Sequence, residues 1–229
     1  MRFLIKAFMV LAVCLALVGC GKKAGIEGKI VDGKDKPMSG VKLIANQAQP
    51  IKGYEHFETK SGSDGTFKFK GVFPSSEYVI EPWSDVWKSV AKVKVQSGPE
   101  GQTSMLEKPF MVRYTLSKAG VLADSKTGLQ WAPSTGQPMN HYQAEGYVRS
   151  LSLDGGGWRL PAIAELKQIH PGHPMLNATS ENWVWSGELC NSYGSPGARD
   201  FYFLTGSDDC SSRGNSDGST RVLAVRSQK

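Results

Sequence analysis

Short runs of alternating apolar and polar residues, separated by turn signals at intervals of about ten residues, constrain the fold of the first third of this chain. The clearest run is Phe67-Lys68-Phe69-Lys70, which follows the turn signal Ser63-Asp64-Gly65 and has one apolar face and one cationic face. Similar runs recur at residues 26–31, 41–45, 78–80 and 90–95. No helical pattern competes with them, so the sequence predicts a small all-β antiparallel sandwich over residues 26–96.

The order of these strands and turns carries a family resemblance. It rests on Gly28-Lys29-Ile30-Val31, then Lys36-Pro37-Met38-Ser39-Gly40-Val41, then residues 63–69, and finally Tyr78. In this order they resemble the carboxypeptidase regulatory-like domain, which has a transthyretin-type (prealbumin-like) sandwich. The resemblance implies a spacer or docking unit without catalytic residues.

The remainder of the chain predicts a second domain of mixed type. Residues 97–115 are expected to form a linker and one extra strand, which is placed over residues 110–116, with a domain boundary near Ser117. Asn140 and Gln143 have the spacing of a helix capping box, and Pro161 is placed to open a second short helix. The chain closes with an alternating strand over residues 221–226, so an α+β domain is expected over residues 116–229.

Several motifs in this second part carry a further resemblance. They are, in chain order, Asp124 with Thr127-Gly128-Leu129-Gln130-Trp131, Ala144 in the first helix, Trp158-Arg159-Leu160-Pro161 with Glu165-Leu166, the Trp-x-Trp-Ser of residues 183–186, and Ala224-Val225-Arg226. Together they resemble the Lcl C-terminal domain family over about residues 116–227. The resemblance implies a C-type-lectin-like fold, distant similarity to formylglycine-generating (sulfatase-modifying) enzymes, and binding or adhesion to an extracellular glycan or protein.

The N-terminus predicts export and lipid attachment. Arg2 and Lys6 precede an apolar stretch, residues 7–18, that is too short to span a membrane and has the length of a signal peptide. Leu17-Val18-Gly19-Cys20 resembles the lipobox of bacterial lipoproteins, which implies cleavage after residue 19 and an acylated Cys20 on a short tether, residues 20–25. Gly21 follows the cysteine where aspartate would signal inner-membrane retention, so the resemblance implies a cell-envelope protein of the outer membrane.

The cysteine content agrees with an exported chain. Cys14 leaves with the signal peptide and Cys20 carries the lipid, so Cys190 and Cys210 are the remaining thiols. In an oxidising compartment two such cysteines most simply form one disulfide, here stapling a long irregular loop rich in Gly, Ser, Asp and Asn. A redox pair or a metal-binding pair is the alternative interpretation.

The charge of the chain does not predict binding to nucleic acid. The formal net charge is +6, and it is +4 once Arg2 and Lys6 are removed with the signal peptide. No basic run is dense enough to predict nucleic-acid binding.

Three patterns could carry chemistry, and each has a simpler structural interpretation. A G-x-S-x-G pattern occurs at residues 214–218, but in a loop rather than between a strand and a helix. His170 and His173 lie close together, yet the neighbouring prolines indicate a turn. Residues 208–217 contain acidic and amide side chains that could hold calcium or form a solvated loop. We therefore predict no enzyme activity, catalytic residue, metal or cofactor; the alternatives are a sulfatase-modifying type of enzyme and a structural envelope protein without a ligand.

Aromatic residues near the predicted disulfide are the candidates for ligand contact. Tyr193, Arg199 and Tyr202 are predicted as the binding residues, with Trp183 as a further candidate. Phe201 and Phe203 are expected to point inward on either side of Tyr202. Trp158 and Trp185 are predicted to be core residues, since tryptophan is usually highly buried.

Overall fold

The computed structural model describes residues 23–170, 183–214 and 220–228. The predicted signal peptide and Cys20 lie outside these ranges, as do His173 and most of the 214–218 pattern. Among the helices of the described ranges, none is long and apolar enough to cross a membrane.

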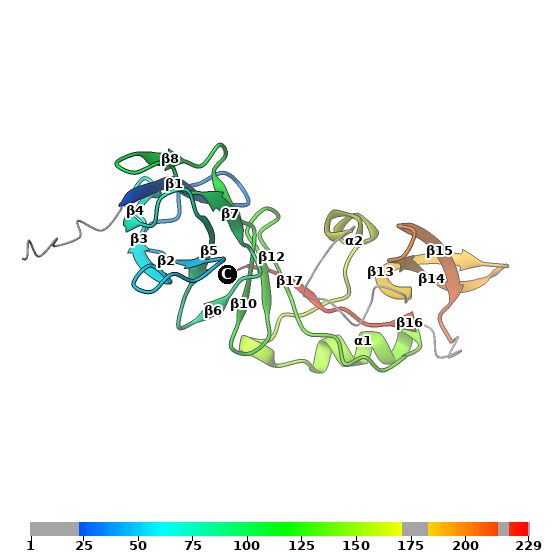
Figure 1. The fold of residues 1–229 in the computed structure, drawn as a ribbon. Helices are drawn as coiled ribbons and strands as arrows, with labels where there is room; N and C mark the ends of the chain where they lie inside the picture. The colour runs from blue at the N-terminus through cyan, green and yellow to red at the C-terminus, as the bar shows by residue number, and fades with distance from the viewer. Residues whose placement is uncertain (1–22, 171–182, 215–219, 229) are drawn as a thin grey trace, which may run out of the picture.

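Two four-stranded sheets form a sandwich in the first half of the chain (Figure 1). One sheet contains β4 (Thr66–Val72), β1 (Ala24–Asp32), β8 (Thr103–Met105) and β9 (Phe110–Val112). The other contains, in order, β3 (His56–Lys60), β2 (Lys42–Gln47), β5 (Glu77–Trp83) and β7 (Val93–Gln96). The predicted alternation is confirmed in β4, where Phe67 and Phe69 are buried and the lysines beside them are exposed.

The core of this sandwich lies between the two sheets. It contains Ile26, Ile30, Leu43, Phe69, Tyr78 and Ile80, among others. The Tyr78 ring is fully buried, and burial raises the pKa of its hydroxyl. That hydroxyl accepts the Phe73 N–H at 3.0 Å and donates to the Tyr54 carbonyl at 3.2 Å, which satisfies a polar group that would otherwise be costly to bury.

Residues 97–112 add to the sandwich, which differs from the expected linker. β8 and β9 both run parallel to β1, and the buried Phe110 lies opposite Ile30. The single strand expected over residues 110–116 is divided at Arg113, because β9 and β10 (Tyr114–Ser117) join different sheets. Parallel pairing joins residues that are far apart in the chain, and local periodicity does not encode it.

A central five-stranded sheet connects the two halves of the chain. Its order is β17 (Val225–Ser227), β12 (Leu129–Trp131), β11 (Leu122–Asp124), β10 and β6 (Trp87–Lys88). β6 belongs to the connection between β5 and β7, so a segment of the first half pairs with a sheet of the second. The Gly33 N–H also donates to Ser125 Oγ at 2.8 Å. The expected boundary near Ser117 is therefore crossed by a strand pairing and a hydrogen bond.

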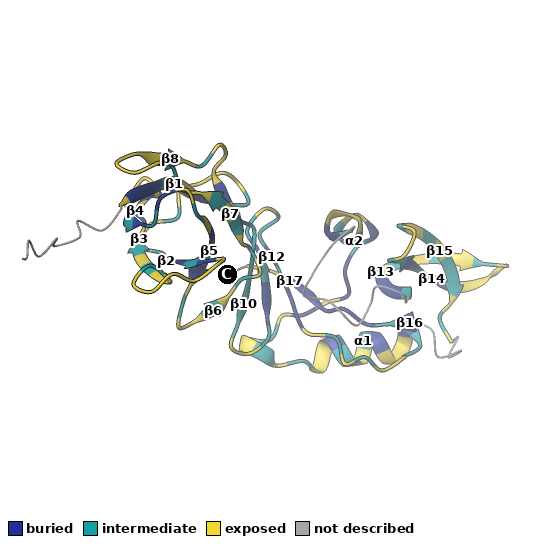
Figure 2. Cartoon of the chain, viewed as in Figure 1, coloured by how far each residue is buried: buried dark blue, intermediate teal, exposed yellow. Residues whose placement is uncertain are grey.

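Two helices flank the remaining sheet. α1 (His141–Ser150) begins with the predicted capping box: Asn140 Oδ1 accepts the Gln143 N–H, and Gln143 Oε1 accepts the Asn140 N–H. A 3-10 turn, η1 (Leu153–Gly155), leads toward α2 (Ile163–Ile169). Figure 2 shows one face of α1 buried and the other exposed. The buried residues are His141, Ala144 and Val148, which pack on a cluster that includes Trp185.

Candidate functional site

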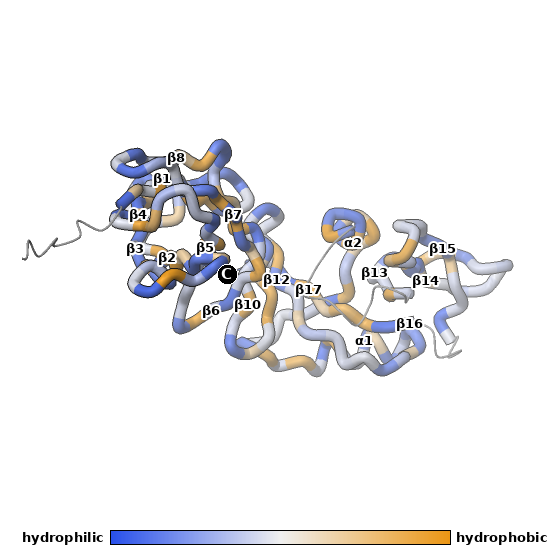
Figure 3. The backbone as a smooth tube through the Cα atoms, in the orientation of Figure 1, coloured by the Kyte–Doolittle hydropathy of each residue, from blue (hydrophilic) through white to orange (hydrophobic). Residues whose placement is uncertain are grey.

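The region after Trp183 forms a sheet, which corrects the expectation of a long irregular loop. β13 (Trp183–Ser192), β14 (Ser195–Tyr202) and β15 (Ser207–Ser212) form an antiparallel meander, and β16 (Thr220–Arg221) lies parallel to β13. Figure 3 shows β14 and β15 mostly in white and blue, because serine and aspartate are the commonest residues there. The apolar alternation that indicates a strand is therefore absent. We call β13 to β16 the stapled sheet.

The predicted disulfide closes this sheet. Cys190 on β13 and Cys210 on β15 are bonded, with their Cα atoms 6.1 Å apart. The bond crosses β14 at Gly197, where an added Cβ would lie 3.0 Å from Cys210 Sγ and 2.9 Å from the Ser211 carbonyl oxygen. Only glycine fits beneath the disulfide without displacing its neighbours.

A bulge in β13 holds the stapled sheet against both helices. The register shifts between Trp185 and Leu189. Within this bulge the carbonyl of Ser186 lies 3.0 Å from His141 Nε2 of α1. Glu188 Oε1 accepts the Ile163 N–H at the start of α2 at 2.8 Å, where the preceding Ala162 has no side-chain acceptor to offer. The bulge thus fixes the sheet in place.

Trp183, Tyr202 and Ser207 form a row across three strands of the stapled sheet. Trp183 lies opposite Tyr202, and Tyr202 lies opposite Ser207. The two aromatic rings stack, with centroids 5.0 Å apart and planes 18° apart, and both are partly buried. Ser207 Oγ lies 2.7 Å from Thr205 Oγ1. The structure therefore brings together two of the predicted contacts, Trp183 and Tyr202, beside two hydroxyl groups.

Arg199 faces the opposite side of the sheet from Tyr202, because the two residues are an odd number of positions apart on β14. It forms an ion pair with Asp208, which also lies 2.7 Å from Lys167 Nζ of α2. Asp208 is thus neutralised by two cations, which weakens the case for calcium there. Asn215 and Asp217, the other candidate calcium ligands, lie outside the described residues.

Tyr193 lies at the far end of the sheet. It forms the two-residue hairpin turn with Gly194 at φ values of 49° and 81°, and its side chain is fully exposed. A ten-residue strand spans about 30 Å, so Tyr193 is too far from Trp183 to contact the same small ligand. The predicted group of Tyr193, Arg199 and Tyr202 is therefore not one site.

A buried polar network under the sheet has no sequence signal. His141 is fully buried, and its Nδ1 accepts the Arg213 Nε–H at 3.1 Å while its Nε2–H donates to Ser186. Arg213 also contacts Glu145 at 2.9 Å and lies over the Tyr142 ring. Burial is the main cause that lowers the pKa of His141. The neutral imidazole thereby ties the end of β15 to α1.

This network predicts acid sensitivity. The folded state favours the neutral form of His141, because the pKa of this residue is lowered on folding. The contribution of His141 to stability is therefore complete above the unfolded-state pKa of about 6.5, and it is lost as the pH falls toward the folded-state pKa. The loss cannot exceed about 1.4 kcal/mol per pH unit for one proton. Urea unfolding at pH 7.5 and 5.5 should show a smaller pH dependence for His141→Gln than for the unchanged protein. Equal dependence in both would contradict the assignment.

Two predicted core residues, and one histidine for which metal binding is the less favoured interpretation, have packing partners in the structure. Trp158 and Trp185 are buried, as predicted. Trp158 lies beneath the Arg226 guanidinium at 4.3 Å, which gives two of the sequence motifs a shared packing role. His170 packs edge-on against Phe201 at 5.7 Å. Within the described ranges, no cluster of three or more His, Cys, Asp or Glu side chains could hold a metal ion.

Comparison with known families bears on the second half of the chain. Residues 120–226 match the Lcl C-terminal domain. The match confirms the resemblance that the sequence motifs predicted, and it covers the central strands β11 and β12, most of β17, both helices and the stapled sheet. β6 and β10 lie outside the Lcl C-terminal domain match, although they extend its central sheet. No curated protein matches the chain.

Solved structures resemble parts of the chain at low identity. A dioxygenase domain from Streptomyces sp. SirexAA-E is 18% identical over 33% of this chain and 54% of its own, with a TM-score of 0.22. A DUF3823 family protein from Parabacteroides merdae is 15% identical, covering 48% of this chain and 56% of its own, with a TM-score of 0.31. The major pilin SpaD from Corynebacterium diphtheriae is 12% identical, covering 52% and 39%, with a TM-score of 0.30. The chain thus spans roughly half or less of their lengths.

Proposed function

We propose that this chain is an exported lipoprotein of the outer membrane whose C-terminal part binds an extracellular glycan. The observation that carries the proposal is the stacked pair of Trp183 and Tyr202 beside the hydroxyls of Ser207 and Thr205. Aromatic rings present an apolar surface that can pack on the flat face of a sugar, and nearby hydroxyls can bond its polar edges.

Rigidity supports the same proposal. The disulfide and the β13 bulge hold the stapled sheet in one arrangement, so little entropy is lost when a ligand binds. The alternative, an enzyme of the sulfatase-modifying type, would use a cysteine pair as metal ligands, and cysteines bonded to each other offer no thiolate for that role. The bonded state of Cys190 and Cys210 favours the binding role over that alternative.

The experiment is a glycan array probed with the soluble mature chain, followed by affinity measurements on the best glycan. Trp183→Ala and Tyr202→Ala should each weaken binding at least about tenfold, which corresponds to ~1.4 kcal/mol. Tyr193→Ala is the matched control, since it removes an exposed aromatic ring from the far end of the same sheet. Loss of binding in the control alone would place the surface at the hairpin tip, and no binding to any glycan would favour a structural envelope protein.

The lipid anchor has a separate test. Cys20→Ser removes the thiol that would carry the acyl chains, so we expect the variant to lose palmitate labelling and to leave the outer-membrane fraction. Cys14→Ser, in the predicted signal peptide, is the control and should keep both. Persistent labelling of Cys20→Ser would contradict lipidation at this residue.

A further inference from the structure

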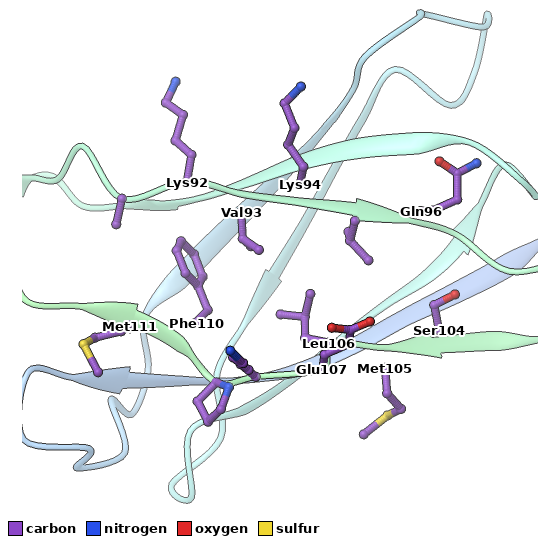
Figure 4. Close-up of a pocket in the computed structure, with 14 residues that line it drawn as sticks. Lys92, Val93, Lys94, Gln96, Ser104, Met105, Leu106, Glu107, Phe110 and Met111 are labelled. Carbon is purple, nitrogen blue, oxygen red and sulfur yellow. The ribbon is translucent and has the colours of Figure 1, made fainter.

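A groove of about 790 Å³ runs between β7 and the β8–β9 segment, on the open side of the sandwich (Figure 4). Its walls are the edge strands of the two sheets. Val93 and Phe110 point into the space between them, as Figure 4 shows, and Leu106 lies on the same wall as Phe110. The groove is therefore apolar inside and bordered by a sheet edge.

The backbone of β7 is available for pairing on the groove side. The Ser97 N–H donates to the Ser76 carbonyl at 2.9 Å, which makes these two residues a hydrogen-bonded pair of the β5–β7 ladder. Such pairs alternate along antiparallel strands, so Val93 and Val95 bond to β5. The N–H and C=O groups of Lys94 and Gln96 then point outward, and no strand of the described chain pairs with them.

Apolar and cationic side chains alternate along β7 and the preceding residue, and this alternation indicates the sequence pattern of a partner strand. Val93 points into the groove, whereas Lys92 and Lys94 point away from it (Figure 4). The two lysines pair with Glu81 and Glu77 of β5, yet their side chains remain 58% and 73% exposed. A strand added beside β7 would place alternate residues over the apolar groove and beside these lysines.

We propose that β7 and this groove bind an extended segment of a partner protein by strand addition, and that the segment alternates apolar and acidic residues. The backbone of Lys94 and Gln96 supplies the hydrogen bonds. Val93, Val95, Leu106 and Phe110 receive the apolar side chains, and Lys92 and Lys94 pair with the acidic ones. A second copy of this chain is a poor occupant, because edge-to-edge pairing of β7 would oppose lysine with lysine.

The test uses a fluorescent peptide of alternating valine and glutamate, seven residues long, and the full mature chain. Fluorescence polarisation should show saturable binding, and a peptide of valine and lysine should not bind. Lys94→Pro should weaken binding at least tenfold, because it removes an outward N–H without touching a bond to β5. Lys94→Ala is the matched control: it removes the charged side chain but keeps the backbone N–H, so it should weaken binding less than Lys94→Pro.

A second experiment uses modified peptides and the unchanged protein, so it does not depend on whether the proline variant folds. A peptide N-methylated on one set of alternate amides should lose binding to the unchanged protein, and the peptide methylated on the other set should keep it. Equal binding of both methylated peptides, or of Lys94→Pro and the unchanged protein, would overturn strand addition. If the unchanged protein forms a dimer and Lys94→Pro abolishes that dimer, the β7 edge binds a second copy of the chain instead.

Discussion

Arg113→Ala is expected to lower the free energy of unfolding by about 3–5 kcal/mol, the range for breaking a buried ion pair. Arg113 Nε and Nη2 bind the two carboxylate oxygens of Asp124 at 2.8 and 2.7 Å, and the Asp124 side chain is fully buried. Burial raises the pKa of Asp124, and the hydrogen bonds and charge of Arg113 lower it below its usual value. Without the guanidinium, the buried carboxylate still accepts the Lys126 N–H at 3.0 Å but has lost its counter-charge.

The pH dependence of this effect identifies its cause. In the unchanged protein the lowered pKa of Asp124 contributes stability that is present at neutral pH and is lost as pH falls through the folded-state pKa. In Arg113→Ala burial is unopposed by the guanidinium, so the carboxyl takes up a proton more readily. The difference in unfolding free energy between the two proteins should therefore shrink from pH 7 to pH 4.

Two controls separate charge from packing in this prediction. Arg113→Lys keeps the charge and loses the bidentate hydrogen bonding, so its free energy of unfolding should lie between those of the unchanged protein and Arg113→Ala. Arg113→Leu combined with Asp124→Asn removes both charges and should recover part of the loss. A constant difference at all pH values would show that packing of Arg113 on the Tyr114 ring, at 4.5 Å, is the larger contribution.

Removing the disulfide is the second large change. The bond joins residues 20 positions apart, and closing a loop of that size is worth about 3 kcal/mol in the chain-entropy model. Cys190→Ser combined with Cys210→Ser should lower the free energy of unfolding by about that amount. Hydrogen exchange should accelerate first in β15, because each of its residues is exposed or only partly buried and its sequence is polar apart from Cys210. Unchanged exchange there would contradict a stapling role.

Gly197 provides an independent test of the same geometry. Gly197→Ala places a Cβ beneath the bond and should destabilise the oxidised protein by about 1–3 kcal/mol, a typical cost of overpacking. Gly187→Ala is the matched control on β13, since its Cβ would meet Leu160 at an ordinary 3.6 Å. The penalty at Gly197 should be smaller when the disulfide is absent. If Gly197→Ala destabilises the protein equally with and without the disulfide, the added Cβ clashes with the backbone of the neighbouring strand alone.

Local sequence signals predicted the parts of the fold that local physics determines. Phe67 and Phe69 alternate with lysines, and the strand lies as predicted. Asn140 and Gln143 form the expected capping box. The disulfide followed from the count of cysteines in an exported chain, and burial of Trp158 and Trp185 followed from their size.

Long-range pairing accounts for most of what the sequence did not reveal. β8 and β9 are three residues each and are defined by their parallel pairing with β1. The distal parts of β14 and β15 lack apolar alternation, because the disulfide replaces an apolar core there. His141 carries no local signal either, since its partners Ser186 and Arg213 come from distant segments. The sequence therefore predicted which residues belong to the candidate site, but it did not predict how they are arranged.

The row of Trp183, Tyr202 and Ser207 as a glycan-binding surface is the central claim, and amide chemical-shift mapping tests it most directly. The isotope-labelled mature chain would be titrated with the best glycan from the array. The largest shifts should fall at these three residues and their neighbours on β13, β14 and β15, with little change at the Tyr193 hairpin or in β7. Shifts concentrated at the Tyr193 hairpin or at β7 would contradict the claim.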